Sequence, residues 1–250
     1  MIYLMGGEIL TGCKQDRILA SDILLAPGTK DLLVPVFCVE QGRWNFTSDN
    51  FYSKDNLGTF KLRSAAQTKN PSAQSEIWNQ IAKENRKMGV TSDSSAYQDA
   101  YDKEENKAEI ARIERNFHNV PHLYEDTTGV VIGLGGKIVS VDIFANKDLF
   151  ENQWPKILKS SALSSLSSNL AGNITQGEAV DFLKSFFDLN YTQKPGIDLG
   201  MEYTYTDSKL NISSLTHEGK VIHLAGFPQV EENAAVIQEN GLEERVKVIK

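Results

Sequence analysis

The chain has 250 residues, of which 40% are hydrophobic and 24% charged, and its formal net charge is −7 at pH 7. This composition is typical of a globular protein and excludes a disordered or collagen-like chain. The sequence pI of about 5.2 argues against broad binding of nucleic acid, which requires a basic face.

The two cysteines, Cys13 and Cys38, are too few for a disulfide framework and do not form a C-x-x-C pair. Both lie among small or apolar residues, so we expect them to be buried as small hydrophobic side chains. The alternative is that Cys38 acts as a nucleophile, which would need a base that the sequence does not place.

Residues 1–8 lack the basic and apolar regions of a signal peptide. No apolar run approaches the ~18 residues that a membrane-spanning helix needs. The default expectation is therefore a cytoplasmic protein with no membrane partner. A signal peptide lost from a truncated N-terminus would leave no trace in this sequence.

Residues 1–44 are predicted to be rich in β-structure. Alternating or apolar runs indicate strands over residues 2–5, 8–10, 17–25 and 32–39, separated by glycine-containing turns. Residues 34–39 are nearly all apolar, which predicts a strand buried on both faces. Pro35 favours an edge position, a strand start or a bulge for that strand.

The next part of the chain is predicted to be irregular over residues 45–70 and then helical. A helix is predicted from residue 70 to Gly89, with Ile77, Trp78 and Ile81 as its apolar stripe. A second helix is predicted over residues 97–117. Residues 92–105 carry five carboxylates and one lysine, a local charge of −4, which favours a solvated helix face over a cation site.

Strands and helices alternate in the rest of the chain. Residues 129–144 predict a β-hairpin around Gly135 and Gly136, because the phosphate-loop spacing and a following helix are missing. Asn146 is expected to cap a helix that Pro155 kinks or divides. Residues 175–178 form a capping box before another helix, and residues 202–206, 210–215 and 220–227 indicate an antiparallel meander.

This order of elements predicts an α+β fold. We expect one composite domain over residues 1–250, made of a β-rich part (1–44), a helical part (70–118), a hairpin (129–144), a second helical part (146–189), a β meander (200–228) and a polar tail (229–250) with a short helix near residues 233–238. The oligomeric state stays open.

The four histidines do not indicate a metal site, and no cofactor is expected. His118 and His122 have the i, i+4 spacing of a helical ligand pair, but Pro121 lies between them and the H-E-x-x-H pattern is absent. His223 lies in an apolar run, so we expect a hydrogen-bonded core residue. A Ser-His-Asp triad stays open, although no G-x-S-x-G elbow supports it.

The densest polar cluster lies beside the apolar strands of the first 44 residues. The candidate ligand-binding residues are Lys14, Gln15, Asp16, Arg17, Glu40, Arg43 and Trp44. Arginine forks suit phosphate or carboxylate, and an indole can stack on a base or sugar. The carboxylates can orient the arginines, accept a hydroxyl, or act as acid and base. The alternative is a set of internal ion pairs that joins two β segments.

Four motifs resemble one bacterial family: residues 7–17 (GEILTGCKQDR), residues 34–44 (VPVFCVEQGRW), the pair Gln74 and Trp78, and residues 142–158. This is the ARG-and-rhodanese-phosphatase-associated protein domain family, formerly a domain of unknown function. Its name records gene neighbours, ADP-ribosylglycohydrolases and phosphatase-like proteins. By association, the resemblance implies a role near ADP-ribose, NAD or nucleic-acid-end metabolism. It implies no reaction and no catalytic residues, and its polar motif positions coincide with the candidate residues.

Two functions from different classes stay open. One is binding of a small anionic, nucleotide-like ligand, in which the basic residues hold anionic groups and Trp44 stacks. The other is a non-catalytic interaction or scaffold module that works beside an enzyme. It predicts that Arg17, Glu40 and Arg43 are paired internally, with no concave pocket beside them. A third hypothesis is a Cys38-dependent enzyme, so the sequence does not decide whether the protein is an enzyme.

Overall fold

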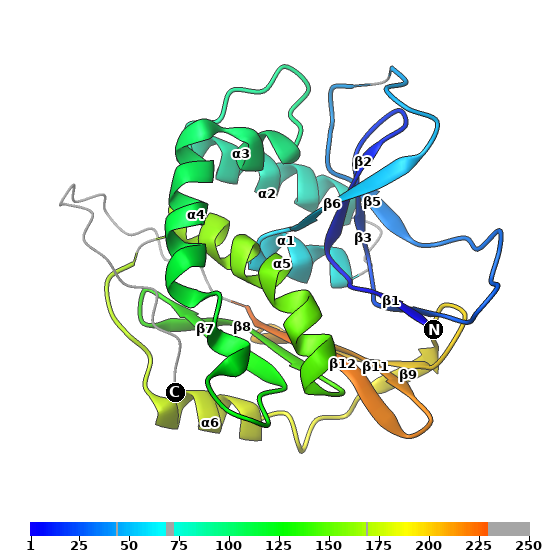
Figure 1. Cartoon of the computed structure of the whole chain (residues 1–250), viewed down its shortest axis with the longest axis vertical. Coiled ribbons are helices and arrows are strands. Elements are labelled where there is room, and N and C mark those ends of the chain that lie inside the picture. The colour runs from blue at the N-terminus through cyan, green and yellow to red at the C-terminus, as the bar shows by residue number, and fades with distance from the viewer. Residues whose placement is uncertain (44, 69–72, 169, 230–250) are drawn as a thin grey trace.

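The structure is a computed structural model, and it describes residues 1–43, 45–68, 73–168 and 170–229. In this part of the chain, helices and three antiparallel sheets of two, four and six strands form an α+β fold (Figure 1). The sequence prediction of an α+β fold with a β-rich N-terminal part and a C-terminal meander is therefore confirmed.

The N-terminal strands form the two smaller sheets. The two-stranded sheet pairs β1 (Ile2–Leu4) with β4 (Ile23–Leu25), and the four-stranded sheet has the order β5 (Val36–Cys38), β3 (Arg17–Leu19), β2 (Glu8–Gly12) and β6 (Phe51–Leu57). The single strand predicted over residues 17–25 is wrong. The chain leaves β3 and turns into another sheet, and the Asp22 carboxylate in this turn accepts a hydrogen bond from the Gly6 N–H.

The strand predicted over residues 32–39 is shorter and less buried than expected. Only residues 36–38 form β5, and the Leu33 side chain before it is 93% exposed. Pro35 lies directly before β5, which is an edge strand. An edge position is favourable there because proline has no N–H to donate to a neighbouring strand. The apolar run therefore reflects an exposed loop followed by a short edge strand, and not a strand covered on both faces.

The described part contains six α-helices and one short 3-10 helix. They are α1 (Phe60–Gln67), α2 (Ala73–Lys87), α3 (Gln98–Asp102), α4 (Glu104–Phe117), η1 (Val120–His122), α5 (Lys147–Leu166) and α6 (Gln176–Lys184). The loop predicted over residues 45–70 is wrong, because it contains β6 and α1. The helix predicted over residues 97–117 is divided at Lys103, whose ψ of 126° is extended.

Helix α5 continues through Pro155 as one helix, so the predicted division there is wrong. Pro155 lies on the exposed side of α5, where water can solvate the carbonyl that its missing N–H leaves unbonded. Asn146 caps α5 and Thr175 forms the capping box of α6, as predicted. The predicted helix start at residues 70–72 and the tail helix at residues 233–238 lie outside the described residues.

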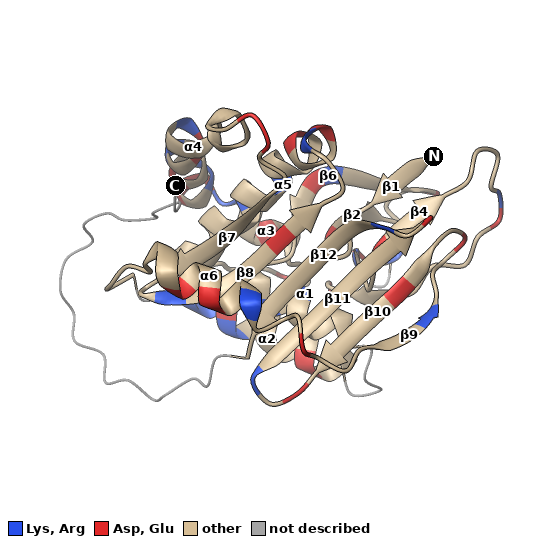
Figure 2. Ribbon diagram, turned by 90° about the horizontal axis from the view of Figure 1, so that it is seen from below, with Lys and Arg blue, Asp and Glu red and all other residues tan. Residues whose placement is uncertain are grey.

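The six-stranded sheet joins the predicted hairpin to the predicted meander. Its order is β7 (Gly129–Leu134), β8 (Lys137–Phe144), β12 (Lys220–Pro228), β11 (Leu210–His217), β10 (Met201–Thr206) and β9 (Thr192–Pro195). Helices α1 and α5 lie behind this sheet in Figure 2 and α6 lies in front of it. Phe186, just after α6, packs with Val141 and Ile212 of the sheet.

One hydrophobic core connects the N-terminal strands with the helices and the six-stranded sheet. It contains Ile9 and Ile18 of the small sheet, Ile77 of α2, Val130 of β7 and Trp154 of α5. On this ground we propose that the parts named above form one composite domain. Among the described residues, no helix is both long and apolar enough to cross a membrane.

Candidate functional site

The loop between β2 and β3 is a tight turn that fixes the Asp16 carboxylate. The Gly12 N–H donates to Asp16 Oδ1 at 3.0 Å. Gly12 has φ +127°, and a Cβ there would lie 2.5 Å from the Asn50 carbonyl oxygen, so the turn requires glycine. Cys13 follows with φ +49°, in the left-handed region.

Arg43 connects this turn with the segment after β5. Its Nη2 lies 3.0 Å from Asp16 Oδ1 and 2.6 Å from Glu40 Oε2. Its Nε donates to both oxygens of Glu40 at 2.8 Å, and its Nη1 donates to the Cys13 carbonyl at 2.8 Å and to Thr47 Oγ1 at 2.9 Å. Every nitrogen of the guanidinium therefore has a protein partner, and the fork holds two carboxylates together.

Glu40 joins the same cluster to the segment before α3. Ser94 Oγ donates to Glu40 Oε1 at 2.7 Å, and the Asp16 N–H donates to Glu40 Oε2 at 3.1 Å. Glu40 also forms an isolated antiparallel bridge with Ala96. Residues 94–96 are thus positioned against the Asp16–Arg43 pair by backbone and side-chain hydrogen bonds.

The two carboxylates have pKa shifts of opposite sign. Burial raises the pKa of Asp16 above its usual value, and the charge of Glu40 adds to this, although the Gly12 N–H and Arg43 act in the other direction. Burial alone would also raise the pKa of Glu40. The hydrogen bonds from Arg43, Ser94 and the Asp16 backbone outweigh it, so the pKa of Glu40 lies below its usual value.

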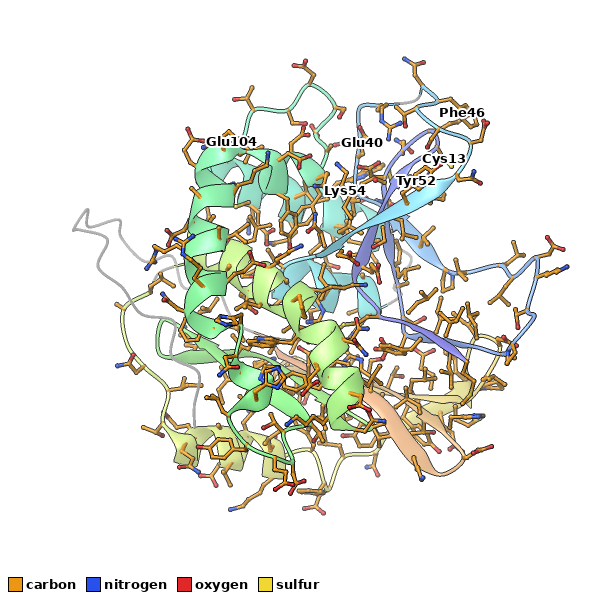
Figure 3. The ribbon with its side chains drawn as sticks, in the orientation of Figure 1. Cys13, Glu40, Phe46, Tyr52, Lys54 and Glu104 are labelled. Atoms are coloured by element: carbon orange, nitrogen blue, oxygen red, sulfur yellow. The ribbon has the colours of Figure 1, made fainter. Side chains whose placement is uncertain are left out.

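A polar groove of about 330 Å³ lies beside this cluster. Its lining residues are Thr11, Gly12, Asp16, Glu40, Arg43, Thr47, Ser48, Tyr52, Lys54, Ser94, Ala96, Gln98, Asp99 and Asp102. Figure 3 labels three of these residues: Tyr52 and Lys54 on β6, and Glu40 on the side of β6 that faces the segment leading into α3. Lys54 faces Asp102 across the groove at 3.4 Å, and the Tyr52 side chain is 58% exposed.

The structure brings three of the seven candidate residues into the groove wall: Asp16, Glu40 and Arg43. The other residues have different positions. Gln15 is buried behind the wall, where its amide donates to the Glu40 carbonyl at 2.8 Å, and Arg17 donates to the Asp16 carbonyl at 3.2 Å. Lys14 lies over the exposed Phe46 ring, with Nζ 5.4 Å from the ring centroid. Trp44 lies outside the described residues.

Sequence reasoning missed the residues that β6 and α3 contribute to the groove lining. Tyr52 and Lys54 lie on β6, in the segment predicted to be a loop, and their i, i+2 spacing places both side chains on one face of the strand. Asp99 and Asp102 lie on α3, in the acidic segment interpreted as a solvated helix face. The local charge of −4 was a signal for the α3 part of the lining, but the sequence did not show that this segment lines the same groove as Arg43.

A second polar cluster is buried between the N-terminal strands and the six-stranded sheet. His223 Nδ1 lies 2.7 Å from Asp22 Oδ2, and His223 Nε2 lies 3.1 Å from Asp142 Oδ1. Arg63 donates to both oxygens of Asp142, at 3.1 and 2.5 Å, and Tyr3 donates to Asp22. None of these residues lines the groove, and the side chains of His223 and Asp142 are 0% exposed, so the cluster stabilises the fold.

The two cysteines and the exposed histidines His118 and His122 do not contact one another in any hydrogen bond or ion pair found among the described residues. Cys38 is buried and its thiol donates to the Glu40 carbonyl at 3.1 Å, whereas Cys13 is half-buried and so less covered than predicted. His118 contacts the Arg115 carbonyl and His122 contacts Glu151. In the ranges that the structure describes, no group of three or more His, Cys, Asp or Glu residues is placed to hold a metal ion.

We expect the substitution Arg43→Lys to lower the free energy of unfolding by about 2 kcal/mol. Lysine keeps the charge but cannot bind Asp16 and Glu40 together, so hydrogen bonds between charged groups are lost. The measurement is urea denaturation, with Arg115→Lys on the exposed side of α4 as the control, which we expect to change stability by less than about 0.5 kcal/mol. Equal stability of the two variants would show that the contacts of the Arg43 guanidinium with Asp16 and Glu40 do not stabilise the fold.

The comparisons with known proteins identify a family and no individual relative. No curated protein and no solved structure matches the chain. Residues 1–227 match the ARG and Rhodanese-Phosphatase-superfamily-associated Protein domain, and this range includes the whole groove and every described helix and strand except the last residue of β12. Because the match covers most of its length, the chain belongs to the family of the ARG and Rhodanese-Phosphatase-superfamily-associated Protein domain.

Proposed function

We propose that the protein binds a small polar, nucleotide-like ligand in the groove between β6 and α3. The observation that carries this proposal is the groove itself, whose volume of about 330 Å³ lies within the range of small-molecule sites. It is lined by an aromatic side chain, a lysine, carboxylates and hydroxyls, and it is positioned by a rigid hydrogen-bonded cluster.

The lining assigns different parts of such a ligand to different residues. The exposed ring of Tyr52 offers a flat face for a base. Lys54 is half-exposed and can exchange Asp102 for an anionic group of the ligand. Arg43 is fully engaged with Asp16 and Glu40, so its role is to position the carboxylates and not to grip a phosphate.

The family supports a role beside other proteins. Its name associates the domain with ARG and Rhodanese-Phosphatase-superfamily proteins, which is consistent with a protein that works beside an enzyme system. A ligand related to ADP-ribose is the nucleotide-like ligand that this association suggests, and it belongs to this proposal.

A thermal-shift titration with adenosine 5′-monophosphate tests the proposal. We expect the melting temperature of the wild type to rise with ligand concentration, because a ligand that binds only the folded state stabilises it. Tyr52→Ala should reduce the shift, since it removes the flat face of the groove.

The matched control is Phe187→Ala, which removes an aromatic ring that is 82% exposed and does not line the groove. This variant should respond to the nucleotide as the wild type does. The proposal fails if the nucleotide leaves the melting temperature of the wild type unchanged, or if Tyr52→Ala responds as strongly as the wild type.

A non-catalytic interaction module is the second candidate function, and the internal pairing of Arg43 and Glu40 favours it. That hypothesis also predicted that no concave pocket lies beside the pair, whereas a groove is present. The same titration separates the two candidates, because an interaction module gives no thermal shift with a nucleotide.

A further inference from the structure

The Asp16 carboxylate has one oxygen that the protein does not use. Oδ1 accepts hydrogen bonds from the Gly12 N–H and from Arg43 Nη2, both at 3.0 Å. Oδ2 has no hydrogen-bond partner within the described ranges, although the side chain is only 8% exposed and lines the groove. A carboxylate can accept about four hydrogen bonds, so Oδ2 is an open acceptor in the groove wall.

Glu40, the other carboxylate of the cluster, has no oxygen that is free to accept a hydrogen bond from a ligand. Its Oε1 accepts from Arg43 Nε and Ser94 Oγ, and its Oε2 accepts from Arg43 and from the Asp16 N–H. Of the two carboxylates that hold Arg43, only Asp16 can therefore contact a ligand without breaking a contact of its own.

The serine and threonine hydroxyls of the groove also face a ligand as acceptors. Each of them already donates its single proton to the protein: Ser94 to Glu40, Ser48 to the Asn50 carbonyl, Thr47 to the Cys13 carbonyl and Thr11 to the Tyr52 carbonyl. A hydroxyl has one donor and two acceptor sites, so what these groups have left is lone pairs. Apart from Lys54, Tyr52 and Gln98, the side chains of the groove therefore offer acceptors, which favours a ligand that supplies donors.

The charge of the lining leads to the same conclusion. Asp16, Glu40, Asp99 and Asp102 carry four carboxylates against the two cations of Arg43 and Lys54. The oxygens of a ligand that is mainly phosphate would face protein acceptors without donating hydrogen bonds to them. Its negative charge would also be repelled by the surplus of carboxylates in the lining. A ligand that is mainly hydroxyl would supply the donors without adding negative charge.

We propose that the groove recognises the vicinal hydroxyls of a ribose-type ring, with Asp16 Oδ2 as the acceptor that selects for them. This inference rests on the proposed nucleotide-like ligand and names the hydroxyl groups of its sugar as the part that the groove recognises. The selection is strong only when Asp16 is ionised, because a carboxylate accepts a hydroxyl proton better than a carboxylic acid does.

Calorimetric titration of two matched ligands tests the inference. Adenosine and 2′,3′-dideoxyadenosine share the base and differ in the vicinal hydroxyls. We expect the wild type to bind adenosine at least about tenfold more tightly, since a site that hydrogen-bonds a hydroxyl rejects the analogue that lacks it. Asp16→Asn should reduce the ratio of the two affinities, whereas Asp181→Asn on the exposed face of α6 should keep it.

A second measurement does not depend on the folding of a variant. Because burial raises the pKa of Asp16, the preference of the wild type for adenosine should decline as the pH falls and Asp16 becomes protonated. Equal affinities of the wild type for the two nucleosides would overturn the inference while the proposed function stands. Preference for a diamine such as putrescine over adenosine would also overturn it. If neither nucleoside nor adenosine 5′-monophosphate binds, the proposed function falls and the inference falls with it.

Discussion

Replacing Asp142 by asparagine is expected to lower the free energy of unfolding by about 3–5 kcal/mol, the usual cost of removing one partner from a buried ion pair. The Asp142 side chain on β8 is 0% exposed and contacts two cations. Asparagine keeps its shape but removes the charge, so Arg63 and His223 would face a single remaining carboxylate, that of Asp22.

Burial alone would raise the pKa of Asp142, but the charges of Arg63 and His223 outweigh it and hold that pKa far below the usual range. The carboxylate is therefore ionised in the folded protein throughout the neutral range. The four charged groups balance one another, two carboxylates against one guanidinium and one imidazolium. This balance is what makes the removal of a single charge costly.

Urea denaturation at pH 7 measures the effect. The control is Asp181→Asn, which removes a carboxylate that is 78% exposed and paired with Lys184 one helical turn away. It should change stability by less than about 0.5 kcal/mol. A loss of under about 1 kcal/mol in Asp142→Asn would contradict the role assigned to the buried cluster.

The stability of the protein is expected to fall as the pH rises through 9, because His223 loses its proton there. Both ring nitrogens of His223 face carboxylates, so both must donate and the folded protein holds an imidazolium. Burial would lower the pKa of His223, but Asp22 and Asp142 outweigh it and raise the pKa to about 9, above the usual value of about 6.5.

A pKa raised in the folded state gives a stabilisation that is complete below the unfolded pKa and lost as the pH passes the folded pKa. The difference between about 6.5 and about 9 corresponds to about 3 kcal/mol. Two other groups face the cluster. Tyr3 stays neutral through this window because burial raises its pKa well above 10, and Arg63 stays charged because its pKa is raised further.

Urea denaturation at intervals from pH 6 to pH 10 measures this loss, and NMR titration of the His223 ring gives its pKa directly. Between pH 6 and pH 10, the free energy of unfolding of His223→Gln should decrease by about 3 kcal/mol less than that of the wild type. His122→Gln, which removes an exposed imidazole, should keep the wild-type profile. Identical pH profiles of the wild type and His223→Gln would show that His223 is not charged in the folded protein.

The elements that sequence reasoning predicted well are those with local causes. The capping box of α6 and the turn at Gly135 and Gly136 depend on neighbouring residues, and both are present. The pairing of β8 with β12 joins residues 142 and 225, which no local pattern encodes. His223 confirms the prediction of a hydrogen-bonded core histidine, but its partners come from distant parts of the chain.

The candidate site shows the same division between local and distant information. The sequence singled out residues 14–17 and 40–44 as a dense polar cluster beside apolar strands, and the structure pairs three of these residues, Asp16, Glu40 and Arg43. Strand β6 has the sequence FYSKDNL, with no apolar alternation in its exposed half, so its pattern resembles a loop. Because β6 and α3 supply much of the lining, the shape and charge of the groove followed only from the tertiary structure.

The most direct test of the proposed groove is an amide spectrum of the ¹⁵N-labelled protein during titration with adenosine 5′-monophosphate. Binding in the groove predicts saturable shifts centred on the amides of Tyr52, Ser94 and Gln98, which lie on its two walls. The amides of α6, on the far face of the six-stranded sheet, should stay unchanged (Figure 2). Shifts that are absent from the groove, or that lie elsewhere on the molecule, would contradict the assignment of this groove as a ligand site.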